Sequence, residues 1–119
     1  MKMLRSEITV NVRHILIRSD SYASDEEAKA QAEAIYQEWK NGAQTEDSFS
    51  ELAEKYSEDT AEKGLYEDVY PGEMVTSFND WCFDDARKPG DTGIVESSYG
   101  YHILYFIQKN DTPTWKVLV

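Results

Sequence analysis

The chain of 119 residues is 40% apolar and 29% charged, a composition typical of one soluble globular domain. Its formal net charge of −11 argues against a nucleic-acid partner, because phosphate binding requires clustered Lys and Arg, which the sequence lacks. No apolar run approaches the ~20 residues that span a bilayer, and the first residues lack the apolar region of a signal peptide. We therefore expect no membrane insertion and no targeting segment in this chain.

The first predicted element is a strand over residues 7–18, which is rich in β-branched residues. Its side chains alternate between two faces, with Val12, His14 and Leu16 on one and Ile15 and Ile17 on the other. Both faces are apolar, as in a strand that is covered on both sides. The segment is therefore predicted to be a central strand of a sheet.

Two amphipathic helices are predicted next. A capping box of Ser24 and Glu27 indicates a helix that ends before Gly42. A second helix is predicted to begin at Ser48, with Glu51 in the same capping relation. Apolar residues recur at helical spacing and are predicted to face the core: Ala28, Ala32, Ile35 and Trp39 in the first helix, and Phe49, Leu52, Ala53 and Tyr56 in the second. The acidic residues on the outer faces are interpreted as a solvated surface.

An irregular segment over residues 57–73 follows, with turns at Gly64 and at residues 71–72. A third, short helix is predicted to be capped by Thr76 or Ser77 and to bury Phe78, Trp81 and Cys82. The sole cysteine, Cys82, cannot form an internal disulfide, and its acidic neighbours would raise its pKa. It is therefore predicted to be a small core residue and not a nucleophile.

Two further strands end the predicted fold. A turn at residues 89–90 leads into a short strand around residues 94–96, a hairpin at residues 97–100 and a long strand over residues 101–109. The long strand places His102, Leu104 and Phe106 on one face and Tyr101, Ile103, Tyr105 and Ile107 on the other. We expect the two histidine-bearing strands to be neighbours in an α+β fold. The last ten residues either pack on the sheet or begin a linker.

The two histidines, His14 and His102, allow three interpretations from the residues alone. Together with Asp59 they could bind a metal ion, although their spacing matches no known metal site. They could serve a serine hydrolase, but the sequence has no Gly-x-Ser-x-Gly turn to hold the nucleophile. They could also simply satisfy each other's hydrogen bonds inside the core. The residues by themselves favour this last, structural interpretation.

Five segments occur in order over residues 8–110, and together they resemble a parvulin-type peptidyl-prolyl cis/trans isomerase domain. They are Arg-His-Ile-Leu-Ile at 13–17, Phe-Ser-Glu-Leu-Ala-Glu-Lys-Tyr-Ser-Glu-Asp at 49–59, Gly-Glu-Met-(x)3-Phe at 72–78, Lys-Pro-Gly-Asp at 88–91 and Tyr-Gly-Tyr-His-Ile at 99–103. The resemblance implies a four-stranded antiparallel sheet flanked by about three to four helices, so a further short strand must lie near residues 65–70. We expect residues 1–119 to form one domain, with a core at about 8–110 and flanking or linker segments at 1–7 and 111–119.

The resemblance also assigns roles to seven residues. It implies catalytic roles for His14, Asp59 and His102, and substrate-binding roles for Tyr66, Met74, Phe78 and Tyr99. Met74 and Phe78 correspond to the proline pocket, Tyr66 to its apolar wall and Tyr99 to the position before the Gly-x-His turn. Asp59 stands where family members carry either Cys or Asp, which excludes covalent catalysis by a thiolate at this position. The resemblance implies no metal ion and no cofactor.

The implied function is isomerisation of X-Pro bonds in unfolded or extended polypeptides. Two departures from the family pattern concern the substrate. Residues 63–69 differ from the usual Gly-Gly-Asp-Leu-Gly-aromatic segment at the rim of the proline pocket. The loop at residues 19–25 is acidic, with only Arg18 beside it, where phosphate-selective parvulins carry a basic cluster. We expect substrates without phosphate, with an acidic residue before proline disfavoured.

Two other functions remain open on the sequence. The domain could have lost catalysis and only bind Pro-containing or apolar segments, as a chaperone does, or its acidic surface could recognise a basic partner. We expect a monomer that is one module of a larger parent protein, similar to the parvulin modules of bacterial extracytoplasmic foldases. That similarity favours a cell-surface or secreted location and leaves a cytoplasmic one open.

Overall fold

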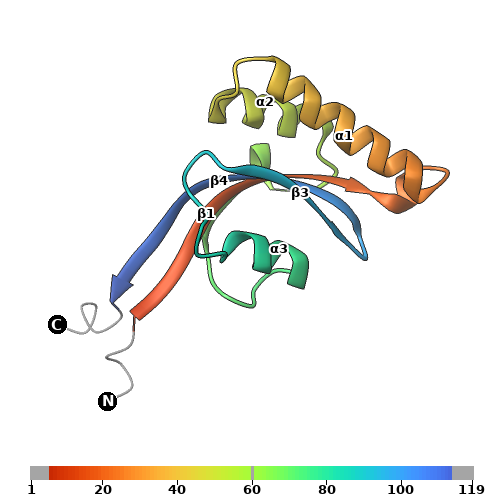
Figure 1. Ribbon diagram of the computed structural model, residues 1–119. Coiled ribbons are helices and arrows are strands. Elements are labelled where there is room, and N and C mark those ends of the chain that lie inside the picture. The colour runs from red at the N-terminus through yellow and green to blue at the C-terminus, as the bar shows by residue number, and fades with distance from the viewer. Residues whose placement is uncertain (1–5, 60, 114–119) are drawn as a thin grey trace.

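The computed structural model describes residues 6–59 and 61–113, which form a four-stranded antiparallel sheet in the order β2-β1-β4-β3 (Figure 1). The strands are β1 (Ser6–Arg18), β2 (Leu65–Val69), β3 (Thr92–Ser97) and β4 (Gly100–Pro113). Helices α1 (Asp25–Asn41) and α2 (Glu46–Tyr56) cover one face, and α3 (Thr76–Cys82) covers the other. The predicted α+β class is confirmed, and the short strand implied near residues 65–70 is β2. No helix within these ranges is long and apolar enough to cross a membrane.

The two central strands, β1 and β4, pair along their whole length, from Ser6 opposite Pro113 to Arg18 opposite Gly100. Antiparallel pairing satisfies the backbone hydrogen bonds of both strands, so the ladder continues beyond the predicted strand ends. It includes residues 6–7 and 111–113, which were expected to be flanking segments. The rest of those segments, residues 1–5 and 114–119, lies outside the described residues.

The sheet separates two apolar clusters, as the alternating pattern of the central strands predicts. The cluster under α1 and α2 includes Ile15, Ile17, Ala28, Ala32, Ile35, Trp39, Phe49, Leu52, Tyr101 and Ile103. The cluster under α3 consists of Val10, Val12, Val69, Phe78, Cys82, Leu104 and Phe106. The two histidines therefore belong to the face that α3 covers, since they alternate with the residues of the first cluster and share the face of Val12 and Leu104.

Helix α1 is capped as predicted, whereas the starts of α2 and α3 differ from the prediction. The Ser24 hydroxyl accepts a hydrogen bond from the backbone N–H of Glu27 at 3.2 Å. Helix α2 begins before Ser48, because Thr45 is its N-cap and exchanges hydrogen bonds of 3.1 Å with Ser48 in both directions. Thr45 is followed by two acidic residues, which stabilise a first helical turn, so the cap lies three residues upstream of the predicted one.

Neither predicted cap of α3 acts as one. The N-cap position is Val75, which offers no side-chain hydrogen bond, and Thr76 is already helical. The Ser77 hydroxyl instead donates to the backbone carbonyl of Glu96 at 2.6 Å, which joins α3 to β3. Cys82 is buried at the end of α3, as predicted. Burial, and not the acidic neighbours named above, raises the pKa of its thiol to about 12.

Gly64 brings the loop before β2 against the backbone of β1. Its φ is +72°, and a Cβ at this position would lie 2.3 Å from the carbonyl oxygen of His14. Gly72 has a similar φ of +89°, but a Cβ there would meet nothing within 4 Å. Replacement of Gly72 by alanine would therefore cost only the strain of a left-handed backbone, whereas replacement of Gly64 would add the cost of a close contact.

We expect Gly64→Ala to lower the free energy of unfolding by about 2–5 kcal/mol, since it adds overpacking to backbone strain. Gly72→Ala has only the strain and should cost about 1 kcal/mol. Urea unfolding at pH 7 measures both values. Equal losses for the two variants would contradict the close approach of Gly64 to His14.

Candidate active site

All seven residues singled out in the sequence line one cavity of about 260 Å³ on the α3 side of the sheet. Its lining residues are His14, Leu16, Arg18, Asp59, Tyr66, Met74, Val75, Phe78, Tyr99 and His102. They come from both central strands, from β2, from the segments that follow α2 and precede α3, from α3 itself, and from the β3–β4 hairpin. The fold thus brings together residues that are up to 88 positions apart. Their roles in catalysis stay predictions.

The floor of the cavity is a pair of buried imidazoles. Nε2 of His14 lies 2.7 Å from Nδ1 of His102, and the rings stack with their centroids 4.8 Å apart. The two residues are only 3% and 4% exposed. One proton occupies the hydrogen bond between the rings, so the two imidazoles cannot both be doubly protonated. The other ring nitrogen of His102, Nε2, lies 2.6 Å from the hydroxyl oxygen of Ser97.

Asp59 stands at the opposite end of this pair. Its Oδ2 atom lies 3.6 Å from Nδ1 of His14 and accepts a hydrogen bond from the Tyr66 hydroxyl. Among the described residues, Nδ1 of His14 is the one buried side-chain nitrogen or oxygen without a hydrogen bond. A carboxylate beside that nitrogen favours a proton on it.

The position of Asp59 is determined by the end of α2. The Ser57 hydroxyl accepts hydrogen bonds from the backbone N–H groups of Leu16, at 3.0 Å, and of Asp59, at 3.3 Å. The backbone N–H of Glu58 donates to the carbonyl of Leu16 at 2.9 Å. These bonds attach the segment after α2 to β1, within reach of His14.

One arrangement of protons is compatible with these contacts and places a proton beside Asp59. A proton on Nδ1 of His14 leaves its Nε2 as the acceptor of the bond from Nδ1 of His102. Nε2 of His102 then accepts from the hydroxyl of Ser97, and that oxygen accepts from the backbone N–H of Tyr99 at 3.1 Å. A chain of hydrogen bonds therefore runs from the hairpin through both rings to the side of Asp59.

The environment keeps the ring of His102 uncharged. Burial lowers the pKa of His102 to about 4, and the neighbouring His14 acts in the same direction, against a smaller opposite effect of Asp59. His102 is therefore neutral at pH 7. Burial, with the hydrogen bond to Asp59, raises the pKa of Tyr66 well above its usual range, so its hydroxyl remains a donor.

Apolar groups form the wall above the imidazoles. Phe78 is fully buried, and its ring meets the rings of His14 and His102 edge-on at centroid distances of 5.1 and 6.0 Å. Met74 and Val75 are half-buried and therefore present the accessible part of the wall. Tyr99 is 56% exposed and stands at the rim.

Tyr66 has both an apolar and a polar role in the site, and the family resemblance implies only the apolar one. Its ring lies 6.4 Å from that of Phe78 and contributes to the wall. Its hydroxyl reaches Asp59, so it also belongs to the polar network. The wall and the network therefore meet in one side chain.

Ser97 and Ser57 are parts of the site that the sequence analysis misses. A signal for Ser97 exists in the hairpin, where Val95 pairs with His102 and Ser97 pairs with Gly100. This register makes Ser97 a diagonal neighbour of His102 on the same face of the sheet. No comparable signal exists for Ser57, because its role depends on how the loop after α2 meets β1.

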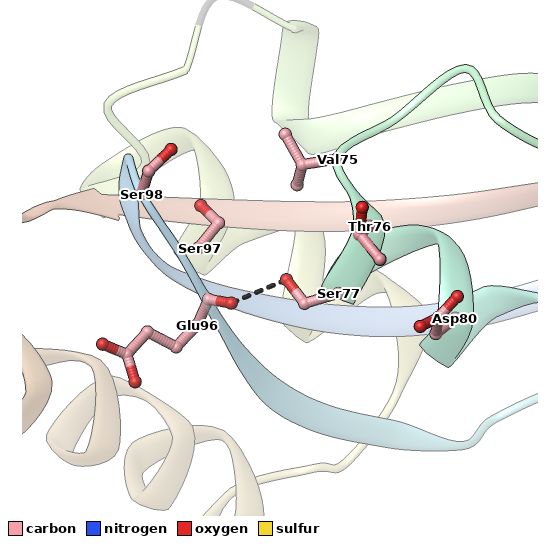
Figure 2. A pocket seen from close by; sticks show the side chains of 7 residues that line it. All are labelled: Val75, Thr76, Ser77, Asp80, Glu96, Ser97 and Ser98. Atoms are coloured by element: carbon pink, nitrogen blue, oxygen red, sulfur yellow. Dashed lines mark hydrogen bonds between the residues drawn. The ribbon is translucent and has the colours of Figure 1, made fainter.

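A second depression of about 570 Å³ adjoins the cavity and shares Val75 with it (Figure 2). It is lined by Val75, Thr76, Ser77, Asp80, Glu96, Ser97 and Ser98. Figure 2 shows the carboxylate of Glu96 extending away from the Ser77 hydroxyl, which binds only the backbone carbonyl of Glu96. The lining of this depression therefore combines hydroxyl-bearing residues with two acidic ones, Asp80 and Glu96.

The described residues contain no group of three or more His, Cys, Asp or Glu side chains arranged to hold a metal ion. The cavity has an apolar wall, a hydrogen-bonded floor and one carboxylate. Such a site can bind an apolar ring and orient a polar group next to it.

Comparisons with known proteins agree with this geometry. The chain is 36% identical over 112 residues to the foldase protein PrsA 1 of Listeria innocua, and 32% identical over 102 residues to the chaperone SurA of Bordetella avium. These matches cover 92% and 83% of this chain but only 34% and 19% of those proteins. The crystal structure of the peptidylprolyl isomerase PrsA from Bacillus cereus superimposes with a TM-score of 0.68 at 27% identity, over 92% of this chain and 39% of that one.

These similarities confirm the parvulin-like fold that the sequence implies. They also show that the domain has its counterparts within larger foldase proteins. The sequence pattern of the PPIC-type PPIASE domain matches residues 1–110, which is most of the chain. The chain therefore belongs to the family of PPIC-type peptidyl-prolyl cis/trans isomerase domains.

Proposed function

We propose that this domain catalyses cis/trans isomerisation of X-Pro bonds in unfolded or extended polypeptides, without a covalent intermediate. The observation that carries the proposal is the cavity in which Met74 and Phe78 face a buried imidazole pair, of which the His102 ring is neutral at pH 7. Membership of the isomerase family supports it. His14, Asp59 and His102 are proposed as the catalytic residues, and Tyr66, Met74, Phe78 and Tyr99 as the substrate-binding ones.

The reaction requires no bond to be made or cut. Rotation about the X-Pro amide has a barrier of about 18–20 kcal/mol, because resonance between the nitrogen and the carbonyl must be broken. Uncatalysed exchange takes tens to hundreds of seconds. A catalyst must therefore bind the twisted amide more tightly than either planar form.

The apolar wall suits the proline ring. Met74 and Val75 offer accessible apolar surface, and Phe78 closes the wall below them. Burial of the ring against these groups removes water from the adjacent carbonyl, whose hydrogen bonds with water favour the planar resonance form. The hydroxyl-lined depression next to Val75 offers room for the residues that flank the proline.

The polar floor suits the twisted amide, and rotation about the amide needs no nucleophile. Asp59 occupies the position where some family members carry a cysteine, and Cys82 is buried and lines a different cavity. The hydroxyl of Ser97 lies 2.6 Å from Nε2 of His102 and so belongs to the same network. A network whose donors and acceptors are already oriented stabilises a changed charge distribution with little reorganisation.

The wider setting is also part of the proposal. The resemblance to parts of PrsA and SurA supports a role as one module of a larger extracytoplasmic foldase, acting on proline-containing polypeptides that are not phosphorylated. We propose that the module acts as a monomer and without a cofactor. Its action on client chains is then limited to the exposed X-Pro segments that reach the cavity.

The first test measures exchange between the cis and trans forms of a short Ala-Pro peptide by NMR exchange spectroscopy. The domain should accelerate exchange, and Met74→Ala should reduce kcat/KM about tenfold, because it removes roughly 1–1.5 kcal/mol of apolar contact with the proline ring. Tyr70→Ala is the control, since Tyr70 is 54% exposed and lies outside the cavity lining. Peptide binding with no acceleration would identify the domain as a binding module without catalysis.

A second test uses the pKa of His102. Because burial lowers this pKa from 6.5 to about 4, the unfolded chain binds more protons than the folded one between these values. The resulting stability is fully present above pH 6.5 and is lost as the pH falls toward 4. Through this group we expect the free energy of unfolding to fall by about 1–3 kcal/mol between pH 7 and pH 4.5.

Urea unfolding of the wild type and of His102→Gln at both pH values isolates this contribution, and the variant should lose less stability. The imidazole resonances of wild-type His102 give an independent readout that does not depend on folding of the variant. They should remain those of a neutral ring at pH 5. A protonated ring at that pH would refute the lowered pKa of His102.

A further inference from the structure

Arg18 is the one positively charged side chain among the described residues that line the catalytic cavity. It ends β1, two positions after Leu16, which also lines the cavity. A guanidinium group is the side chain best suited to bind a carboxylate through two parallel hydrogen bonds. Arg18 would therefore be the natural partner for an acidic substrate residue next to proline.

The edge of the Arg18 guanidinium that would bind a substrate carboxylate is already occupied. Nε of Arg18 lies 3.0 Å from Oδ1 of Asp20, and Nη2 lies 2.9 Å from Oδ2, so both carboxylate oxygens are bound. The hydrogen bond from Arg18 holds the pKa of the Asp20 carboxyl below its usual range, so Asp20 remains charged at neutral pH. A second acid, Glu58, accepts the backbone N–H of Arg18 at 2.7 Å.

The backbone keeps Asp20 in this place. Asp20 lies in the 3-10 turn η2 (Ser19–Ser21), directly after β1. The N–H of Ser19 donates to the carbonyl of Tyr99 at 3.1 Å, which attaches the turn to the rim of the cavity. The Ser19 hydroxyl also donates to Asp25 at 2.9 Å, at the start of α1. The competing carboxylate thus lies in a turn whose first residue, Ser19, is bonded both to the β3–β4 hairpin and to the start of α1.

We propose that Asp20 determines the charge preference of the site by occupying Arg18 as an internal substitute for a substrate carboxylate. The inference rests on the proposed function and assigns a cause to the expectation that an acidic residue before proline is disfavoured. The ion pair is partly exposed, with Arg18 46% and Asp20 69% accessible. Removal of the Asp20 charge should therefore release Arg18 without disturbing the histidine pair.

The test measures kcat/KM of the wild-type chain and of Asp20→Asn. The substrates are pairs of peptides that carry either Glu or Gln, placed before proline in one pair and after it in the other. Asp20→Asn should raise the ratio of kcat/KM for the Glu peptide to kcat/KM for the Gln peptide about two- to fivefold, the range expected for an exposed ion pair. The rise should occur at one of the two positions that flank proline. Dissociation constants for the same peptides, from NMR titration, should change in the same ratio. The difference should shrink at 0.5 M salt because the charges are then screened.

Two variants make the comparison specific. Asp85→Asn removes the same charge at an exposed site outside the cavity and should leave the ratio unchanged. Arg18→Gln in the Asp20→Asn background should abolish the gain. An unchanged ratio in Asp20→Asn, or a gain that persists without Arg18, would refute the role of Asp20. Absence of turnover with all peptides would contradict the proposed function instead, and the ratio of dissociation constants would still decide the role of Asp20.

Discussion

The hydrogen bond between His14 and His102 depends on the register of the two central strands. His14 pairs with Leu104, and His102 pairs with Leu16, which places both rings diagonally on one face of the sheet. A shift by one residue would move one ring to the opposite face, under α1 and α2, and leave buried ring nitrogens without partners. The pairing that completes the apolar core is therefore the same pairing that assembles the floor of the cavity.

Much of the fold follows from alternation in the sequence, because the central strands are covered on both faces and their apolar residues obey a period of two. Strand β2 is different. Only its last residue, Val69, is buried, and Asp68 has a positive φ of 55°, so its pattern does not alternate. It was expected only because the family resemblance implied a fourth strand. The start of α2 at Glu46 was missed because two capping signals, Thr45 and Ser48, lie within one turn.

The site was predictable to the extent that it lies on regular elements or matches a family motif. All seven expected residues share one cavity. The contacts that orient them arise between loops and strands that are distant in sequence, as for Ser57 with β1 and the Tyr66 hydroxyl with Asp59. Local propensity contains no information on such contacts, since they depend on the packing of the completed fold.

The division of the apolar core by the sheet allows stability and specificity to vary separately. None of the buried residues of α1, such as Ile35 and Trp39, lines the histidine cavity, and they all pack against the opposite face. Related domains could thus acquire a more heat-resistant interior through changes under α1. The rim of the cavity, with Tyr99 and the turn that precedes α1, would then evolve on its own.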